Sequence, residues 1–367
     1  MRDWLEPLAG GIVLAIALLD VFLTVLYARA GTGLLARRLA RAVWRVFRGL
    51  SGGRNGRILS YCGPVQLVML VLMWSLLLTL GAGLVMHPAL GTSVTSSSGP
   101  TETDFITALF VGGSSMSFVG ASDYGPQSPG YKLLFLFNSL VGMSVTSLTL
   151  TYLMQVYTAL RGRNTAGLMI QGQSGETGDA AELIARWGPR GHFDGGYSNL
   201  STVASQLGAV KETHHFYPVL FYFRFEQPYY AASRMLLVAL DAAALVRTAL
   251  DPRELGWLRE SAAMAELEGG STLLLRTLTE NFPVQEGASP DDGQSRDRGL
   301  RRYEQALQRL RDASIPTRGD VEAGAREYLA LRASWEPKIE GIASALGYSM
   351  DEVDTAGRGR RASPATS

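Results

Sequence analysis

The sequence contains one cysteine, Cys62, and four histidines, and this scarcity excludes two kinds of site. A single thiol cannot build an intrachain disulfide framework or a metal centre made of several thiolates. The histidines occur without an HExxH or CxxC motif, so the pattern gives no basis for a zinc site. No Walker A motif, nucleophile elbow or other catalytic constellation occurs, and we expect no enzyme and no resident cofactor.

Net charge is also nearly absent, because 34 basic residues face 33 acidic ones over 367 positions. This balance argues against a nucleic-acid partner bound through a global positive field. What the chain has in abundance is apolar residues, and these are crowded into the part that ends near Leu160. The distribution predicts a membrane protein with a soluble C-terminal tail.

Three segments are long and apolar enough to cross a hydrocarbon layer, which takes roughly 20 such residues. We expect transmembrane helices over 8–28, 65–86 and 133–160. The first has a weakly basic start and no convincing cleavage site, so we interpret it as a retained helix and not as a signal peptide. It contains one acid, Asp20, for which we expect a structural hydrogen bond to a neighbouring helix.

The arginines predict the orientation of these helices. Between the first two segments the chain has eight arginines and no acid: Arg29, Arg37, Arg38, Arg41, Arg45, Arg48, Arg54 and Arg57. The loop over 87–130 has no lysine or arginine. Basic loops stay in the cytoplasm, so we expect a multi-pass protein of the cell membrane with its N-terminus outside and its C-terminal domain cytoplasmic.

Within the basic loop, Arg37, Arg41, Arg45 and Arg48 recur at helical spacing. This spacing predicts an amphipathic helix that lies on the membrane with its arginines on anionic lipid headgroups. The same arginines also serve as a plain topology signal, and the two interpretations are compatible.

A short apolar stretch lies between the second and third segments. Asp104 can cap a helix over 105–111, which is too short to span the membrane, and a run rich in glycine and serine follows over 112–126. Non-helical backbone at membrane depth is tolerated only where it is buried in protein or lines water. We therefore interpret 103–126 as a re-entrant loop; for Gly112, Gly113, Ser114 and Ser115, close helix packing is the alternative.

Here the chain resembles the pore of tetrameric potassium channels, over residues 61–160. In that family a T-T-V-G-Y-G-D filter is commonly followed, after two residues, by proline. This chain has Ser117, Phe118, Val119, Gly120, Ala121, Ser122 and Asp123, then Tyr124, Gly125 and Pro126. Val119, Gly120, Asp123 and Pro126 match in register, and Ser117 stands in for the first threonine. Gly142 lies where the family has its inner-helix hinge.

The resemblance implies a homotetramer that passes a monovalent cation, K⁺, through residues 117–123. Three residues depart from the family pattern. Ser122 replaces a glycine whose backbone freedom helps to aim the carbonyl oxygens, Ala121 lacks the usual aromatic ring, and Phe118 replaces a threonine that supplies a hydroxyl ligand. A weakly selective cation channel, or a non-conducting sensor or scaffold on a channel-like fold, therefore stays open as an alternative.

The predicted fold class is an all-α membrane protein: three transmembrane helices with a re-entrant pore helix and filter loop, and an all-α C-terminal domain. The polar residues of the third span are Asn138, Ser144, Thr146, Thr149 and Thr151; we expect some of them to face water and others only to bond back to the helix backbone. The predicted regions are an N-terminal helix (1–30), a basic linker (31–60), the pore domain (61–160), a helical domain (161–282), a flexible linker (283–298), C-terminal helices (299–350) and a disordered tail (351–367).

Within the tail, the glycine-rich stretch 162–179 is interpreted as a linker and the aromatic run 214–230 as core. Residues 229–250 are apolar enough to suggest a fourth span, but Arg234, Asp241 and Arg247 interrupt them, so we expect a buried soluble helix. The adjacent His214 and His215 point in different directions on a helix, which disfavours a shared metal.

Overall fold

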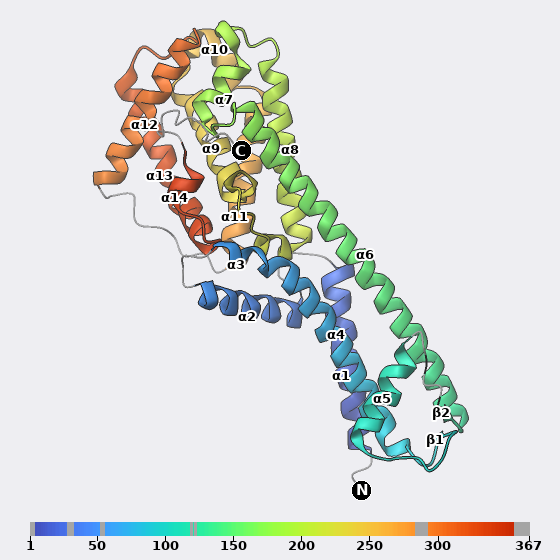
Figure 1. Cartoon of the computed structure of the whole chain (residues 1–367). Helices are drawn as coiled ribbons and strands as arrows, with labels where there is room; N and C mark the ends of the chain where they lie inside the picture. The colour runs from blue at the N-terminus through green and yellow to red at the C-terminus, as the bar shows by residue number, and fades with distance from the viewer. Residues whose placement is uncertain are drawn as a thin grey trace, which may run out of the picture. The chain divides into compact units, whose positions relative to one another are not determined.

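The computed structural model describes residues 4–27, 33–51, 56–117, 120, 123–282 and 293–355. These residues are almost entirely helical, and the sheet among them is a single pair of short strands (Figure 1). The chain forms two compact units. The membrane unit comprises Met1–Arg45 and Pro64–Tyr157, and the tail unit comprises Val46–Gly63 and Thr158–Ser367. The all-α class predicted from the sequence is confirmed.

Three helices in the described part of the chain are long and apolar enough to cross a membrane. They are α1 (Leu5–Val21, extended by a π-helical turn over Phe22–Leu26), α4 (Cys62–Met86) and α6 (Pro129–Gln173). Each of these helices contains most or all of one of the spans predicted from hydropathy, 8–28, 65–86 and 133–160.

Helix α6 is much longer than the predicted span, with 45 residues and no break. The interpretation of 162–179 as a linker is wrong for residues 162–173, which are helical. Gly167 is needed there for close packing, because a Cβ atom at this position would lie 2.4 Å from the carbonyl oxygen of Tyr229. Its cost in helix propensity, about 1 kcal/mol relative to alanine, is offset by that contact.

Asp20 is fully buried and joins three helices of the membrane unit. Its Oδ1 accepts hydrogen bonds from the backbone N–H groups of Leu35 (2.7 Å) and Ala36 (3.4 Å) in the first turn of α2 (Leu34–Ser51). Its Oδ2 accepts one from Nε1 of Trp74 in α4 (2.9 Å). The carboxylate therefore caps α2 from α1, where its charge also favours the positive end of the helix dipole. The predicted structural hydrogen bond is confirmed.

Helix α2 is the predicted amphipathic helix. Val43 and Trp44 are buried, and Nε2 of Gln66 in α4 donates to the carbonyl oxygen of Ala40 at 3.1 Å. The arginines predicted to share one face are all exposed: Arg37, Arg41, Arg45 and Arg48. A five-residue helix, α3 (Gly56–Ser60), follows in the tail unit.

The tail unit is a helical bundle around α9 (Ala232–Thr248). Every residue of α9 except Arg247 is buried, and it packs against α7, α11 and α13, so the predicted buried helix is confirmed. The other helices are α7 (Ala180–Trp187), α8 (Gly196–Phe216), α10 (Pro252–Arg259), α11 (Ala262–Asn281), α12 (Gly293–Asp312), α13 (Val321–Ala345) and α14 (Met350–Val353).

Two predicted irregular regions are partly ordered. Helix α12 starts at Gly293, so the prediction of a flexible linker over 283–298 is wrong from that residue onward, and 283–292 lie outside the described residues. The predicted disordered tail starts with α14, where Ser349 and Glu352 form a capping box. Residues 351–355 are thus structured, and 356–367 lie outside the described residues.

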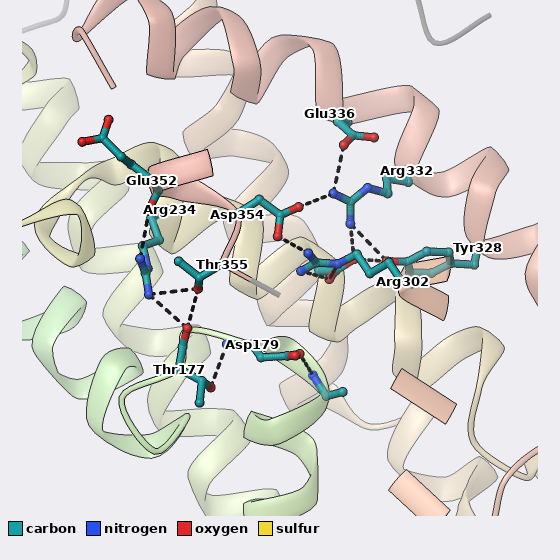
Figure 2. Close-up of polar contacts among 12 residues, drawn as sticks. Thr177, Asp179, Arg234, Arg302, Tyr328, Arg332, Glu336, Glu352, Asp354 and Thr355 are labelled. Carbon is teal, nitrogen blue, oxygen red and sulfur yellow. Dashed lines mark hydrogen bonds and ion pairs between the residues drawn. The ribbon is translucent and has the colours of Figure 1, made fainter. Parts of the chain in front are cut away.

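A buried carboxylate, Asp241, ties α9 to α12 and α13. Its oxygens accept hydrogen bonds from the Tyr328 hydroxyl (2.6 Å), Nη1 of Arg332 (3.1 Å) and Nε of Arg302 (2.8 Å); Figure 2 shows these three side chains converging. Burial disfavours the charged form, but the positive charges of Arg302 and Arg332 outweigh burial and lower the pKa of Asp241.

Replacing this carboxylate by an amide is expected to destabilise the tail unit. Asp241→Asn removes one partner of a buried ionic cluster, which costs about 3–5 kcal/mol. Unfolding of the purified protein, followed by circular dichroism in denaturant, measures the change. Glu304→Gln, at an exposed acid of α12, is the matched control and should have little effect.

The effect of Asp241→Asn also has a pH dependence. The folded pKa is lowered, so the carboxylate stabilises the protein above its unfolded pKa, about 3.9. That contribution disappears as the pH falls below this value towards the folded pKa. The difference between wild type and variant should therefore be full at neutral pH and shrink in acid; a difference that does not change with pH contradicts the assignment.

Candidate pore site

Helix α5 (Phe105–Met116) is an apolar helix of 12 residues, too short to cross a membrane. Asp104 caps it as predicted: its Oδ1 accepts from the N–H groups of Ile106 (2.8 Å) and Thr107 (3.1 Å), and its Oδ2 accepts from the Thr107 hydroxyl (2.7 Å). The helix continues to Met116, so residues 112–116 are helical, whereas the sequence predicted that the loop starts at 112.

Glycines allow α5 to approach α4 closely. A Cβ atom on Gly112 would lie 2.4 Å from the backbone nitrogen of Gly83, and one on Gly113 would lie 2.9 Å from Cγ2 of Thr79. Gly83 in turn lies against Leu109 of α5. The close-packing interpretation of Gly112 and Gly113 is therefore confirmed, and it explains why the helix persists through two poor helix formers.

The C-terminal turn of α5 is held against α6. Nδ2 of Asn138 donates to the Ser115 hydroxyl at 3.0 Å, and that hydroxyl donates to the carbonyl oxygen of Gly112 at 2.7 Å. One turn further along α6, a Cβ on Gly142 would lie 1.9 Å from the carbonyl oxygen of Met116. Gly142 thus lets the two backbones touch. Helix α6 is unbroken at this glycine, and a hinge there stays a prediction.

The segment 117–123, which carries the predicted filter, starts directly at the end of α5. Ser117 is exposed and closes the helix, with its backbone N–H (3.0 Å) and its hydroxyl (2.9 Å) both donating to the carbonyl oxygen of Ser114. Gly120 is exposed and has a φ of +69°, a left-handed conformation that favours glycine. The filter residues Phe118, Val119, Ala121 and Ser122 lie outside the described residues.

The far end of the segment is fixed by the two short strands. Strand β1 (Val94–Ser96) pairs antiparallel with β2 (Tyr124–Pro126), and the N–H of Ser97 donates to the carbonyl oxygen of Asp123 at 2.8 Å. Tyr124 also packs against a small apolar core of α4, α5 and the intervening loop. The segment is therefore anchored at both ends within the membrane unit.

Helix α6 presents three faces within the membrane unit. The face buried against its own chain contains Asn138, Gly142, Val145 and Thr149. An exposed apolar stripe contains Leu136, Leu140, Met143, Leu150 and Met154. An exposed polar stripe contains Ser144, Thr151 and Gln155, whereas the exposed Ser147 lies among the apolar stripe, four residues after Met143 and three before Leu150. Of the predicted candidates, Asn138 and Thr149 are buried, whereas Ser144, Thr146 and Thr151 are exposed. Thr146 lies off the polar stripe, and its hydroxyl donates to the carbonyl oxygen of Gly142 at 2.8 Å.

The hydroxyls of the polar stripe are partly engaged by the helix itself. Ser144 donates to the carbonyl oxygen of Leu140 at 2.8 Å and Thr151 to that of Ser147 at 2.9 Å. Such a hydroxyl keeps its acceptor capacity and can still bind water. Gln155, which the sequence analysis did not single out, adds two donors and an acceptor to the same stripe; its spacing from Ser144 and Thr151 was the available signal.

Within the tail unit, a buried arginine bonds the C-terminal part of α6 to the aromatic run. Arg163 donates from Nη1 to the carbonyl oxygen of Leu220 (2.8 Å) and from Nη2 to that of Phe223 (3.0 Å), within the predicted aromatic core. A Cβ on Gly63, the residue after the first of α4, would lie 2.6 Å from the Phe223 ring. The aromatic run thus contacts the start of α4 and the extension of α6.

His214, the first residue of this run, is buried in α8 and is not charged at neutral pH. Its Nδ1 lies 2.9 Å from the carbonyl oxygen of Val210, while burial, followed by the positive charge of Arg163, lowers the pKa of His214 to about 4. Among the described residues, no group of three or more His, Cys, Asp or Glu side chains is placed to hold a metal ion.

No family model matches the sequence, and no solved structure matches it. The chain is similar to YdjJ of Bacillus subtilis (strain 168), an uncharacterized membrane protein, with 22% identity over 237 residues. The similarity covers 64% of this chain and 67% of the relative. The three helices that are long and apolar enough to cross a membrane agree with the description of this relative as a membrane protein. This chain is a membrane protein.

The contact between Gly142 and Met116 predicts a position-specific effect of adding a methyl group. Gly142→Ala should destabilise the protein by about 1–3 kcal/mol, the usual cost of overpacking. Gly162→Ala is the matched control, because Gly162 lies in the same helix with open space around it and alanine is the better helix former. Thermal unfolding in detergent micelles should give a lower midpoint for Gly142→Ala alone; equal midpoints for the two variants would show that the α5–α6 contact is loose.

Proposed function

We propose that this protein is a cation channel, a homotetramer in which four copies of segment 117–123 surround the ion path. The observation that carries the proposal is the placement of α5. It is a short, capped, apolar helix between two long apolar helices, its last turn is fixed to α6 at Asn138 and Gly142, and an anchored loop with a left-handed glycine follows it.

The electrostatics of α5 favour a cation at its C-terminal end. The last carbonyl groups of a helix bear partial negative charge, and half-helices use this end to stabilise cations in membranes. Gly112 and Gly113 allow this end of α5 to be held in the membrane unit without bulky side chains, and Asp123, on the far side of the segment, is exposed. A loop placed between such groups suits a permeant cation.

The faces of α6 support the tetramer. Three exposed polar residues on one stripe, Ser144, Thr151 and Gln155, are costly in hydrocarbon but acceptable where the helix lines water. The neighbouring apolar stripe suits packing against another copy or lipid. One chain provides one such loop and one such helix, so a closed ring needs several copies, and the resemblance to potassium channels gives four.

The proposed permeant ion is K⁺, on the strength of that resemblance. Phe118, Ala121 and Ser122 favour two alternatives: a weakly selective cation channel, or a non-conducting sensor or scaffold. In the proposed orientation the N-terminus lies outside and the tail unit in the cytoplasm, which puts the exposed arginines of α2 at the anionic cytoplasmic leaflet.

The reversal potential tests selectivity directly. We expect purified protein in a planar bilayer, with K⁺ on one side and Na⁺ on the other, to reverse near the K⁺ equilibrium potential. Reversal near zero means a weakly selective pore. The combined variant Ser117→Thr, Phe118→Thr, Ala121→Tyr and Ser122→Gly restores the family filter and should increase K⁺ flux; silence of this variant and of wild type, each as a verified tetramer, contradicts a channel.

Thiol labelling tests the water-filled path without requiring conduction. In a Cys62→Ala background, Ser144→Cys and Thr151→Cys should react with a membrane-impermeant, water-soluble thiol reagent in reconstituted vesicles. Leu150→Cys, on the exposed apolar stripe of the same turn, is the control and should stay unlabelled because it faces protein or lipid. Equal labelling of all three positions, or none, removes the support that the polar stripe gives to the proposal.

A further inference from the structure

Residues 352–355 form a clasp between the end of α6 and the rest of the tail unit, and we refer to them as the C-terminal clasp. Asp354 accepts hydrogen bonds from two arginines of different helices, Nη1 of Arg302 in α12 and Nη2 of Arg332 in α13, the latter at 2.8 Å (Figure 2). Each arginine binds a different oxygen of this carboxylate.

The two arginines are shared between an inner and an outer carboxylate. Asp241, the inner one, has a side chain that is 1% exposed and also bonds Tyr328. Asp354, the outer one, is 18% exposed and comes from a segment that follows a four-residue helix. Arg302 and Arg332 themselves are buried. Asp354, the outer carboxylate, is therefore the one that another anion can replace without opening the core.

The clasp is fastened to the loop that ends α6. The Thr355 hydroxyl donates to the carbonyl oxygen of Thr177, which also accepts from Nη2 of Arg234 at 3.2 Å. Arg234 further donates to Oε1 of Gln171 in α6 (3.1 Å) and to the carbonyl oxygen of Glu352 (3.0 Å). Gly178, with a φ of +64°, leaves room for this guanidinium, since a Cβ there would lie 2.2 Å from Nη2.

Only an anion can take the place of Asp354. If the carboxylate left without replacement, two buried guanidinium groups would each lose an ionic partner, which costs several kcal/mol. Their forked N–H groups match the oxygens of a carboxylate or a phosphate. A free carboxylate has to compete with a tethered one whose effective concentration is on the order of mM. A phosphate group has a charge of about −1.5 to −2 and three acceptor oxygens, so it competes with Asp354 for the two arginines better than a free carboxylate does.

The surrounding acids limit this advantage without removing it. Glu336 stays with Arg332, to which it is bound at 2.9 Å, and Asp241 stays in the inner position. Asp179, the half-buried N-cap residue of α7, lies nearby; desolvation raises its pKa, and the charge of Arg302 opposes that shift.

We propose that Arg302 and Arg332 form a binding site for the phosphate group of a soluble small molecule, and that Asp354 occupies this site when the ligand is absent. Binding displaces Asp354, and with it the bond from Thr355 to the loop that ends α6. Any effect of this binding on ion flow would depend on the proposed channel function, whereas the binding itself does not depend on it.

Inorganic phosphate is the probe for the vacated site. With the full-length protein in detergent at constant ionic strength, Asp354→Ala should bind phosphate about tenfold more tightly than wild type, because the tethered competitor is gone. The readout is the rise in thermal unfolding midpoint with phosphate concentration, with chloride as the reference salt. Asp351→Ala, at an exposed acid of α14, is the control and should respond like wild type. Equal responses of the two variants overturn the proposal.

Hydrogen exchange on the unmodified protein covers the case in which Asp354→Ala does not fold. Phosphate should increase deuterium uptake in peptides that contain residues 352–355 and leave those of α8 and α11 unchanged. Unchanged uptake in the clasp at phosphate concentrations that shift the unfolding midpoint would place the anion elsewhere and overturn the site. Both readouts report binding, so they give the same result whether or not the protein conducts ions.

Discussion

The close approach of the α5 backbone to α4 and α6 is the constraint on which the membrane unit depends. Gly83 and Gly112 bring α5 onto α4, and Gly142 brings α6 onto the carbonyl oxygen of Met116. In a membrane the hydrophobic effect gives no preference for helix contact over lipid contact, so such short backbone distances and the hydrogen bond from Asn138 supply the specificity. Ser117, which directly follows α5, takes its position from this contact.

Among the described residues, each unit also has one buried carboxylate whose bonds set the arrangement of its helices. Asp20 joins α1, α2 and α4 through backbone and indole N–H donors, and Asp241 joins α9, α12 and α13 through two arginines and a tyrosine. A buried charge is costly unless it is fully satisfied, so each acid permits one arrangement of its partners and penalises others. The acid in the membrane unit is satisfied by neutral donors and the one in the tail unit by cations.

The sequence predicted the features that depend on local patterns. Hydropathy located the three apolar helices, Asp104 marked the start of α5, and the arginine spacing identified α2. It did not predict where α5 ends, because Gly112 and Gly113 look like loop residues until the partner helix α4 is known. For the same reason the glycines of 162–173 suggested a linker, and Asp354 suggested nothing until Arg302 and Arg332 came together from separate helices. The filter itself is untested, since four of its residues lie outside those described.

Helix α6 contributes residues to both units. The helix carries Gly142 and the polar stripe in the membrane unit, and Arg163, Gly167 and Gln171 in the tail unit, with no break between them. In the tail unit, Arg163 donates to the carbonyl oxygen of Leu220, and Gln171 accepts from Arg234. In the membrane unit, Gly142 lies against the end of α5. Two glycines of α6 therefore have the same physical reason in each unit: Gly142 meets the carbonyl oxygen of Met116 and Gly167 meets that of Tyr229, so each lets another backbone approach the helix where a Cβ atom would clash.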